Sequence, residues 1–271
     1  MKAARFDYAR PTTVAEAVRL IAELPDAKLM AGGQSLGPML NLRLAQPALI
    51  VDITRIAELA EVADAGEALC LGATITHAAI EDGRVKDPTG GFLARVAAGI
   101  GYRAVRTKGT IGGSLAHADP AADWLCALTA LDAELIVASP AGRRRLPLAG
   151  FVLGAMQTAL KADELIAAVR IGKFSSRARF GYHKVCRKVG DFADAIAAAV
   201  EDPERGVCRI VASTPAGAPI VVAADAATIA SPPEIAALEQ RLSEAGSCGD
   251  AYDTRLRAVV VKRALEALSG R

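Results

Sequence analysis

The first 53 residues alternate apolar strand candidates with helical segments, and this alternation limits the folds open to the chain. Strands are predicted at 4–11, 27–30 and 48–53, the second of them buried, and helices at 14–24 and 38–45. Thr12 or Thr13 can cap the first helix, because a hydroxyl oxygen accepts a backbone N–H where a helix begins. Strands that alternate with helices pair in parallel through right-handed crossovers, so this segment predicts a small parallel βαβαβ unit.

After residue 56 the pattern changes to paired strands separated by short turns. Residues 59–73 place two strand candidates around Asp-Ala-Gly-Glu, and residues 133–148 do the same around Pro-Ala-Gly, which is typical of antiparallel hairpins. Short helices are predicted at 91–101 and 120–131, and a further strand at 163–171. The middle of the chain is therefore expected to be mostly antiparallel.

A polar, basic segment at 172–181 marks a shift in composition, and we predict the domain boundary there. The expected domains are residues 1–174, with subdomains of about 1–55 and 56–174, and residues 175–271. The second domain is predicted to hold a three-stranded meander at 193–224 and two helices at 233–245 and 251–268. The fold class is thus α+β, with a parallel unit, an antiparallel sheet and a separate C-terminal domain.

Composition argues against several classes of partner. The chain of 271 residues has a net charge of +2 and only 4% aromatic residues, whereas nucleic-acid binding normally requires a clustered basic face with aromatic side chains. Its N-terminus carries charges where a signal peptide needs an apolar core. No uninterrupted apolar run approaches the roughly 20 residues of a membrane span. We therefore expect a cytoplasmic protein without a membrane span.

The cysteines and histidines do not form the patterns of a metal site. The five cysteines are dispersed and include no C-x-x-C pair, which argues against a disulfide framework, a zinc site or an iron–sulfur cluster in this chain. We expect reduced core cysteines at all five positions, which are Cys70, Cys126, Cys186, Cys208 and Cys248. The histidines His77, His117 and His183 lack ligand spacing and are expected to be hydrogen-bonded structural residues.

A glycine-containing segment, AGGQSLG at 31–37, follows the second strand and precedes a helix. Backbone N–H groups in such a turn converge on an anion, and the missing side chains let a pyrophosphate approach. The segment has no lysine after Gly37, which a P-loop requires, and it lacks the G-x-G-x-x-G spacing of a dinucleotide fingerprint, although Asp52 imitates the ribose-binding acid of that motif. Taken alone, it is better explained as a tight strand-to-helix turn.

A second segment, KGTIGGSLAHADPAAD at 108–123, again places a glycine pair before a serine. Two such turns could hold the two phosphates of one dinucleotide in a cleft between the subdomains. Asp123 lies near the start of a predicted helix, where it is either a helix-terminus charge or an acceptor for a ligand hydroxyl or ring nitrogen. The pair of segments therefore favours a nucleotide site more strongly than either segment does.

These two segments, together with GYHKVCRKVGDFADAIAAAV at 181–200, resemble the FAD-binding medium subunit of the molybdenum hydroxylases, in particular the carbon monoxide dehydrogenase type. The resemblance extends over essentially the whole chain. It implies a two-subdomain FAD-binding region of the vanillyl-alcohol oxidase type, followed by a C-terminal domain of three antiparallel strands with helices. It also implies an oxidoreductase that is catalytic only within a complex.

The resemblance assigns FAD-contacting roles to particular residues, with no catalytic base and no metal ligand in this chain. It matches Asp123 to an aspartate that contacts FAD and Lys184 to a lysine that reaches the flavin, where it could stabilise the anionic reduced ring. The residues matched to the two pyrophosphate loops and to the walls of the FAD site are Ala31, Gly32, Gly33, Gln34, Ser35, Leu36, Ile100, Thr110, Ile111, Gly112, Gly113, Ser114 and Ile166. Tyr102, Lys108 and Trp124 depart from the pattern and are expected to alter the edge of the flavin or the docking surface.

The resemblance further implies a complex of a large molybdopterin subunit, a small subunit with [2Fe–2S] clusters and this flavoprotein, assembled as a dimer of heterotrimers. Electrons would pass from molybdenum through the clusters to FAD and on to an external acceptor. One alternative is a stand-alone FAD-dependent oxidoreductase of the same fold superfamily, which the missing substrate-cap acids and flavin-linking His or Cys motif disfavour. Another is a binding or scaffold protein that has lost its cofactor, which the intact glycine segments disfavour.

Overall fold

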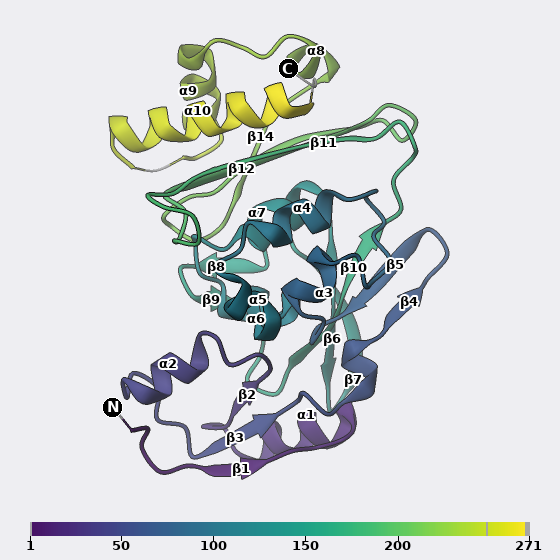
Figure 1. The fold of residues 1–271 in the computed structure, drawn as a ribbon, viewed down its shortest axis with the longest axis vertical. Helices are drawn as coiled ribbons and strands as arrows, with labels where there is room; N and C mark the ends of the chain where they lie inside the picture. The colour runs from purple at the N-terminus through teal and green to yellow at the C-terminus, as the bar shows by residue number, and fades with distance from the viewer. Residues whose placement is uncertain (1, 248, 269–271) are drawn as a thin grey trace.

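The computed structural model describes residues 2–247 and 249–268, and its three main sheets follow one another along the long axis of the molecule (Figure 1). The N-terminal unit at one end of the molecule is the predicted parallel βαβαβ arrangement, with strand order β1-β3-β2. Its elements are β1 (Asp7–Ala9), α1 (Val14–Glu23), β2 (Lys28–Met30), α2 (Leu36–Asn41) and β3 (Leu49–Asp52). Thr13, not Thr12, caps α1, because its side chain accepts the N–H of Glu16.

The prediction that the second strand is buried is wrong. β2 lies at the edge of the three-stranded sheet and its residues are exposed or half-buried. The central strand, β3, is buried along its whole length and packs against the apolar face of α1. The carboxyl end of this edge strand continues directly into the glycine-containing segment 31–37.

The middle of the molecule is a five-stranded antiparallel sheet of order β4-β5-β10-β6-β7, with its helices beside it (Figure 1). Both predicted hairpins and the further strand predicted at 163–171 are confirmed. The strands are β4 (Val62–Asp64), β5 (Ala68–Gly72), β6 (Glu134–Ser139), β7 (Gly142–Pro147) and β10 (Leu165–Gly172), and a small ribbon is added by β8 (Val152–Gly154) and β9 (Gln157–Thr158). Strand β10 is central and joins the two hairpins.

Of the helices in this region, only two were predicted from the sequence, and both are confirmed as α4 (Phe92–Ala98) and α7 (Asp123–Ala130). The others are η1 (Ala57–Ala60), α3 (His77–Glu81), α5 (Arg103–Lys108) and α6 (Ile111–His117). The expectation of a turn at the second glycine segment is wrong, because residues 111–117 form α6. Thr110 caps this helix, so the glycine pair lies in its first turn.

The C-terminal region contains the three predicted strands and a fourth, unpredicted strand that begins within the polar, basic segment 172–181. The sheet has the order β11-β12-β13-β14, with strands β11 (Arg179–Val185), β12 (Ala195–Asp202), β13 (Val207–Ala212) and β14 (Ile220–Val222). The helices are α8 (Ala226–Ala230), α9 (Ile235–Glu244) and α10 (Ala251–Leu268), of which the last two were predicted. Helix α10 lies across β11 and β12 (Figure 1).

Strand β12 is buried at every position because both faces of its sheet are covered. Ala195, Ala197 and Ala199 pack into the core under α9 and α10, whereas Ile196 and Ala198 pack into the core shared with α4 and α7. This alternation follows the two-residue period of a strand. Strand β11 is consequently held against the antiparallel region, and the boundary at 174/175 stays a prediction.

The cysteines only partly occupy the predicted core positions. Cys126 is buried, but Cys70, Cys186 and Cys208 are partly exposed, so the prediction of core cysteines is wrong for these three, and Cys248 lies outside the described residues. Among residues 2–247 and 249–268, no helix combines the length and the apolar character needed to cross a membrane. The same residues contain no group of three His, Cys, Asp or Glu side chains that could hold a metal ion.

Candidate functional site

A cleft of about 1030 Å³ runs between the parallel unit and the antiparallel region. This volume lies at the upper end of the roughly 300–1000 Å³ range of small-molecule and cofactor sites. Its walls come from the segment after β2, from the segment around α5 and α6, from the loop before α7, and from the start of β10. A short piece of the C-terminal region, Gly190 to Phe192, completes the lining.

The structure brings the predicted site residues together, with two exceptions. Ile111 and Lys184 do not line the cleft, because Ile111 is fully buried in the core and the Lys184 ammonium is bound by other groups of the protein. The predicted residues that line it are Ala31, Gly32, Gly33, Gln34, Ser35, Leu36, Ile100, Thr110, Gly112, Gly113, Ser114, Asp123 and Ile166. Segments about eighty residues apart in the sequence thus form one surface, as the two-segment hypothesis requires.

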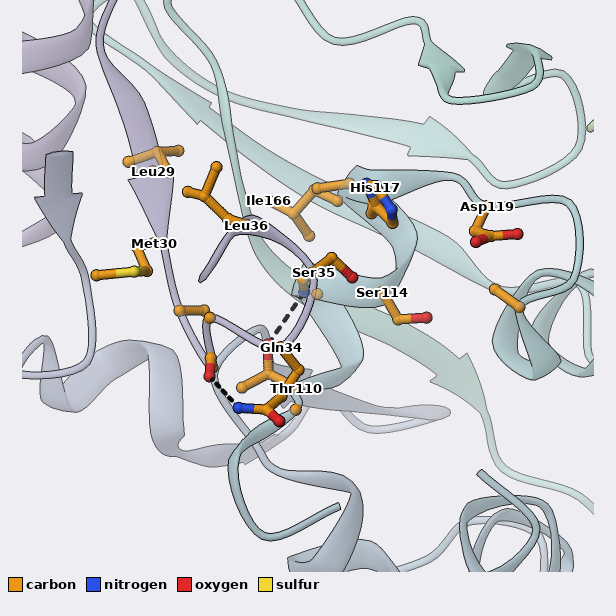
Figure 2. A pocket seen from close by; sticks show the side chains of 18 of the residues that line it. Leu29, Met30, Gln34, Ser35, Leu36, Thr110, Ser114, His117, Asp119 and Ile166 are labelled. Atoms are coloured by element: carbon orange, nitrogen blue, oxygen red, sulfur yellow. Dashed lines mark hydrogen bonds between the residues drawn. The ribbon is translucent and has the colours of Figure 1, made fainter. Parts of the chain in front are cut away.

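We call residues 31–37 the first glycine loop, and its backbone offers free donors to the cleft. Among the hydrogen bonds of the described residues, none uses a backbone N–H of residues 32–36 as its donor. Gly33 has a φ of +68°, a left-handed conformation that glycine adopts without strain and that turns the chain into α2. The Gln34 side chain steadies the turn by donating from Nε2 to the carbonyl oxygen of Gly32 at 3.1 Å (Figure 2).

We call residues 110–114 the second glycine segment, and the backbone donors of residues 111–114 are occupied. The N–H groups of Ile111 and Gly112 donate to Ile75 O and Ala73 O at 3.0 and 2.9 Å. The N–H of Gly113 donates to the Thr110 side chain at 3.1 Å, and that of Ser114 donates to the Thr110 carbonyl at 3.0 Å. This segment therefore presents side-chain hydroxyls and a glycine surface to the cleft rather than free N–H groups.

One glycine of each segment allows a close approach that a side chain would prevent. A Cβ on Gly32 would lie 1.9 Å from the carbonyl oxygen of Lys108, so only glycine allows the first loop to approach the residues just before the second segment. A Cβ on Gly112 would lie 2.4 Å from that of Ala73, so only glycine allows α6 to pack on the loop after β5. Figure 2 shows Gln34 and Ser35 of the first loop and Thr110 and Ser114 of the second segment among the residues that line the cleft.

Asp123 opens α7 and is buried, with 7% of its surface exposed, yet it lines the cleft. Its Oδ1 atom accepts a hydrogen bond from Lys184 Nζ at 2.8 Å and another from the Tyr182 hydroxyl. Lys184 also donates to the carbonyl oxygen of Gly99 at 2.6 Å. The Lys184 ammonium thus neutralises the buried Asp123 carboxylate. Asp123 lines the cleft and Lys184 does not.

His77 and Trp124 form a buried pair behind the second glycine segment. Trp124 Nε1 donates to His77 Nδ1 at 3.1 Å, and the backbone N–H of His77 donates to Gly109 O at 2.9 Å. Burial, with the charge of Arg106, lowers the pKa of His77 to about 4, so the ring is neutral at pH 7. Trp124 is fully buried and does not line the cleft, whereas Tyr102 lines it and is 54% exposed. The expected effect of these residues on the flavin edge or the docking surface stays a prediction.

Several residues of the cleft were not found by reading the sequence. Met30, His117, Asp119, Met156 and Phe192 all contribute to its lining. Met30 ends β2 and His117 ends α6, whereas the other three lie in the connections that follow α6, β8 and β11, and no spacing pattern links the five. Only their distance from the glycine segments in the folded chain reveals them.

The sequence comparison decides the family. Residues 4–173 match the family described as FAD binding domain in molybdopterin dehydrogenase. The chain belongs to this family. The match covers the parallel unit, the five-stranded sheet and both glycine segments, so it includes the whole cleft except Gly190 to Phe192.

Individual relatives agree with the family. The carbon monoxide dehydrogenase medium chain of Hydrogenophaga pseudoflava is 39% identical over 197 residues, which are 72% of this chain and 69% of the relative. The caffeine dehydrogenase subunit beta of Pseudomonas sp. (strain CBB1) is 36% identical over 215 residues, which are 78% of this chain and 73% of the relative.

A solved structure extends the likeness to the whole chain. The structure of carbon monoxide dehydrogenase from Hydrogenophaga pseudoflava that lacks the Mo-pyranopterin moiety contains a chain similar to this one with a TM-score of 0.89 and 33% identity, covering 100% of this chain and 99% of that chain. This flavoprotein is thus an FAD-binding member of an oxidoreductase family, and its C-terminal region keeps the arrangement of that structure.

Proposed function

We propose that this chain is the FAD-carrying electron-transfer subunit of a molybdenum hydroxylase complex. It takes electrons from the iron–sulfur clusters of a partner subunit and passes them through FAD to an external acceptor. The observation that carries the cofactor part is the row of free backbone N–H groups at residues 32–36, all of which line a cleft of cofactor size. Such groups hold an anion without a charged side chain, which suits a pyrophosphate.

The residues of the cleft have separable tasks toward FAD. The first glycine loop would hold the pyrophosphate, and Thr110 and Ser114 would add hydroxyl groups from the opposite wall. Ile100 and Ile166 would supply an apolar surface, and Asp123 would accept a hydrogen bond from the cofactor. FAD itself supplies the electron-transfer chemistry when it is bound. The protein excludes water, fixes the orientation of the cofactor and sets its electrostatic surroundings.

The partner subunits are proposed from the names of the relatives. Medium chain and subunit beta are names for parts of larger enzymes, and the described residues hold no metal-binding cluster. A large molybdopterin subunit and a small [2Fe–2S] subunit would supply those centres, in a cytoplasmic dimer of heterotrimers. By name, the two relatives act on carbon monoxide and on caffeine, at similar identity to this chain. The oxidised substrate is therefore a property of the large partner.

Replacement of Gly33 tests the cofactor site. Gly33→Val forces a β-branched residue into a φ of +68° and places its side chain beside Met30 in the cleft. We expect a loss of FAD affinity of roughly a hundredfold or more, because the loop can no longer present its N–H groups. Isothermal titration of the flavin-free chain with FAD measures this loss.

Gly83→Val is a matched control. Gly83 has a φ of +65°, has open space around it and does not line the cleft, so it carries the same backbone strain without touching the site. It should lower stability as much as Gly33→Val while leaving FAD affinity unchanged. Equal affinity in the two variants would contradict the proposed cofactor site.

Electron transfer is tested by adding the partners. When the FAD-loaded chain is produced together with its large and small subunits, the visible absorption of the flavin should bleach on addition of the substrate of the large subunit. The FAD-loaded chain alone should show no bleaching with the same compound. A chain that oxidises an organic substrate without any partner would instead identify a stand-alone oxidoreductase.

A further inference from the structure

The two carboxylate oxygens of Asp123 have different surroundings. Oδ1 accepts hydrogen bonds from both the Tyr182 hydroxyl and Lys184 Nζ, the latter at 2.8 Å. Within the described part of the chain, Oδ2 accepts none. The side chain is thus held through one oxygen, and the other oxygen keeps its full capacity to accept.

Oδ2 opens onto the cleft. Within residues 2–247 and 249–268, the sole buried side-chain nitrogen or oxygen without a partner is Nε of Arg170, so Oδ2 is not enclosed by protein. Asp123 is 7% exposed, and the surface it contributes is part of the cleft lining. An occupant of the cleft that displaces water from this oxygen must supply a donor in its place, because an acceptor buried without a partner costs free energy.

Tyr182 reaches Asp123 from the C-terminal sheet. It lies two residues before Lys184 on β11, so both side chains stand on the same face of the strand, and that face packs on the core around α4 and α7. The ring of Phe92 lies edge-on to the Tyr182 ring, with centroids 6.4 Å apart, and fixes its direction. Burial and the nearby Asp123 carboxylate raise the pKa of Tyr182 well above its ordinary value, so the hydroxyl is a permanent donor at neutral pH.

We propose that Tyr182 is a positioning residue of the cofactor site: together with Lys184 it saturates Oδ1 of Asp123 and thereby presents Oδ2 to one N–H or O–H donor of the bound cofactor. This inference rests on the proposed function, in which that cofactor is FAD. Torsion about the Cβ–Cγ bond of an aspartate is soft and nearly two-fold, so a carboxylate without such anchors rotates and exchanges its oxygens. Two donors from one strand of the C-terminal sheet hold it in a single orientation.

A double-mutant cycle on FAD affinity tests the proposal. Tyr182→Phe keeps the ring and removes the hydroxyl, and we expect the dissociation constant of FAD to rise roughly tenfold, as for the loss of a hydrogen bond to a charged group. In an Asp123→Asn background, which already weakens FAD binding, the same change should have less than about a twofold effect, because Tyr182 acts through Asp123. A purely structural role would lower affinity equally in both backgrounds.

Tyr8→Phe is the matched control, because the Tyr8 hydroxyl also donates to a buried aspartate, Asp52, and neither residue lines the cleft. It should leave FAD affinity unchanged. If Tyr182→Phe fails to fold, Lys184→Gln enters the same cycle with the same expected coupling. Equal losses in both backgrounds, or no loss, would overturn the positioning role while FAD still binds to the unmodified chain. An unmodified chain that takes up no FAD would overturn the proposed function together with this inference.

Discussion

The two glycine segments look alike in the sequence, yet they contribute to the cleft in different ways. Each has a glycine pair before a serine, at Gly32 to Ser35 and at Gly112 to Ser114. In the first loop the backbone N–H groups of residues 32–36 are free and Gly33 adopts a positive φ. In the second segment every N–H of residues 111–114 is bonded within the protein, and the glycines lie in a helix. We therefore expect the first segment to hold a ligand and the second to support the wall opposite.

The difference shows that glycine meets two separate physical needs here. At Gly33 it allows a left-handed backbone, which a residue with a side chain adopts only with strain. At Gly112 the backbone is ordinary helix, and glycine is needed because α6 lies too close to Ala73 for any side chain. A glycine pair in a sequence does not by itself reveal which need applies.

Gly112→Ala should give the largest effect on stability. Its Cβ would lie 2.4 Å from the Cβ of Ala73 and 2.8 Å from the Ala73 backbone, and both helix α6 and its neighbour are fixed by hydrogen bonds. We expect the free energy of unfolding of the FAD-free chain to fall by about 3 kcal/mol, as for an overpacked core. Urea denaturation followed by the fluorescence of Trp124 measures this change.

Gly37→Ala is the corresponding control in the first loop. Nothing lies within 4 Å of the added Cβ and Gly37 already sits in helix α2, so its stability should stay the same or rise slightly. If Gly112→Ala were as stable as Gly37→Ala, the close approach of α6 to Ala73 would not be a requirement of the fold.

Much of the fold could be predicted from local pattern. The strand and helix alternation of the first 53 residues and the two hairpins depend on neighbours in the sequence, and all of them are present. Helix α6 could not be predicted in this way, because two glycines disfavour a helix by about 1 kcal/mol each. Hydrogen bonds to the carbonyl oxygens of Ala73 and Ile75, which are distant in sequence, stabilise the start of this helix instead.

The site could be predicted where its residues form a motif. The loops and Asp123 lie together in the cleft, whereas Tyr182 was missed because a tyrosine in a strand ordinarily reads as core. The two-residue spacing of Tyr182 and Lys184 was the available clue, once residues 179–185 are taken as a strand. The sequence holds no such clue for Met156 and Phe192, because they reach the cleft from connections whose course only the folded chain determines.

The buried pair of His77 and Trp124 behind the second glycine segment should make the stability of the chain sensitive to acid. Because the pKa of His77 is about 4 in the folded chain and near 6.5 when unfolded, the unfolded state takes up a proton first as the pH falls. The contribution of the neutral His77 ring to the free energy of unfolding is therefore fully present above pH 6.5. It is lost as the pH falls towards 4, and the free energy of unfolding then decreases by roughly 2–3 kcal/mol at most.

His77→Asn isolates this contribution. The asparagine oxygen can still accept from Trp124 Nε1, but the side chain does not titrate. Chemical denaturation of the variant between pH 7 and pH 4 should show a shallower fall in stability than the unmodified chain. Parallel curves would mean that His77 is protonated as readily in the folded chain as in the unfolded one.

The smallest expected effect comes from removing the hydroxyl group of Thr110 in the second segment or of Ser35 in the first loop. The Thr110 side chain caps α6 by accepting the N–H of Gly113, whereas Ser35 stands at the corresponding place before α2 and makes no capping hydrogen bond. Thr110→Ala should therefore lower the free energy of unfolding of the FAD-free chain by about 1 kcal/mol. Ser35→Ala should leave that free energy unchanged and weaken FAD binding alone, because its hydroxyl is free for the ligand. If both changes lowered stability equally, the first loop would be a structural cap like the second segment, and the division between a binding loop and a supporting helix would fail.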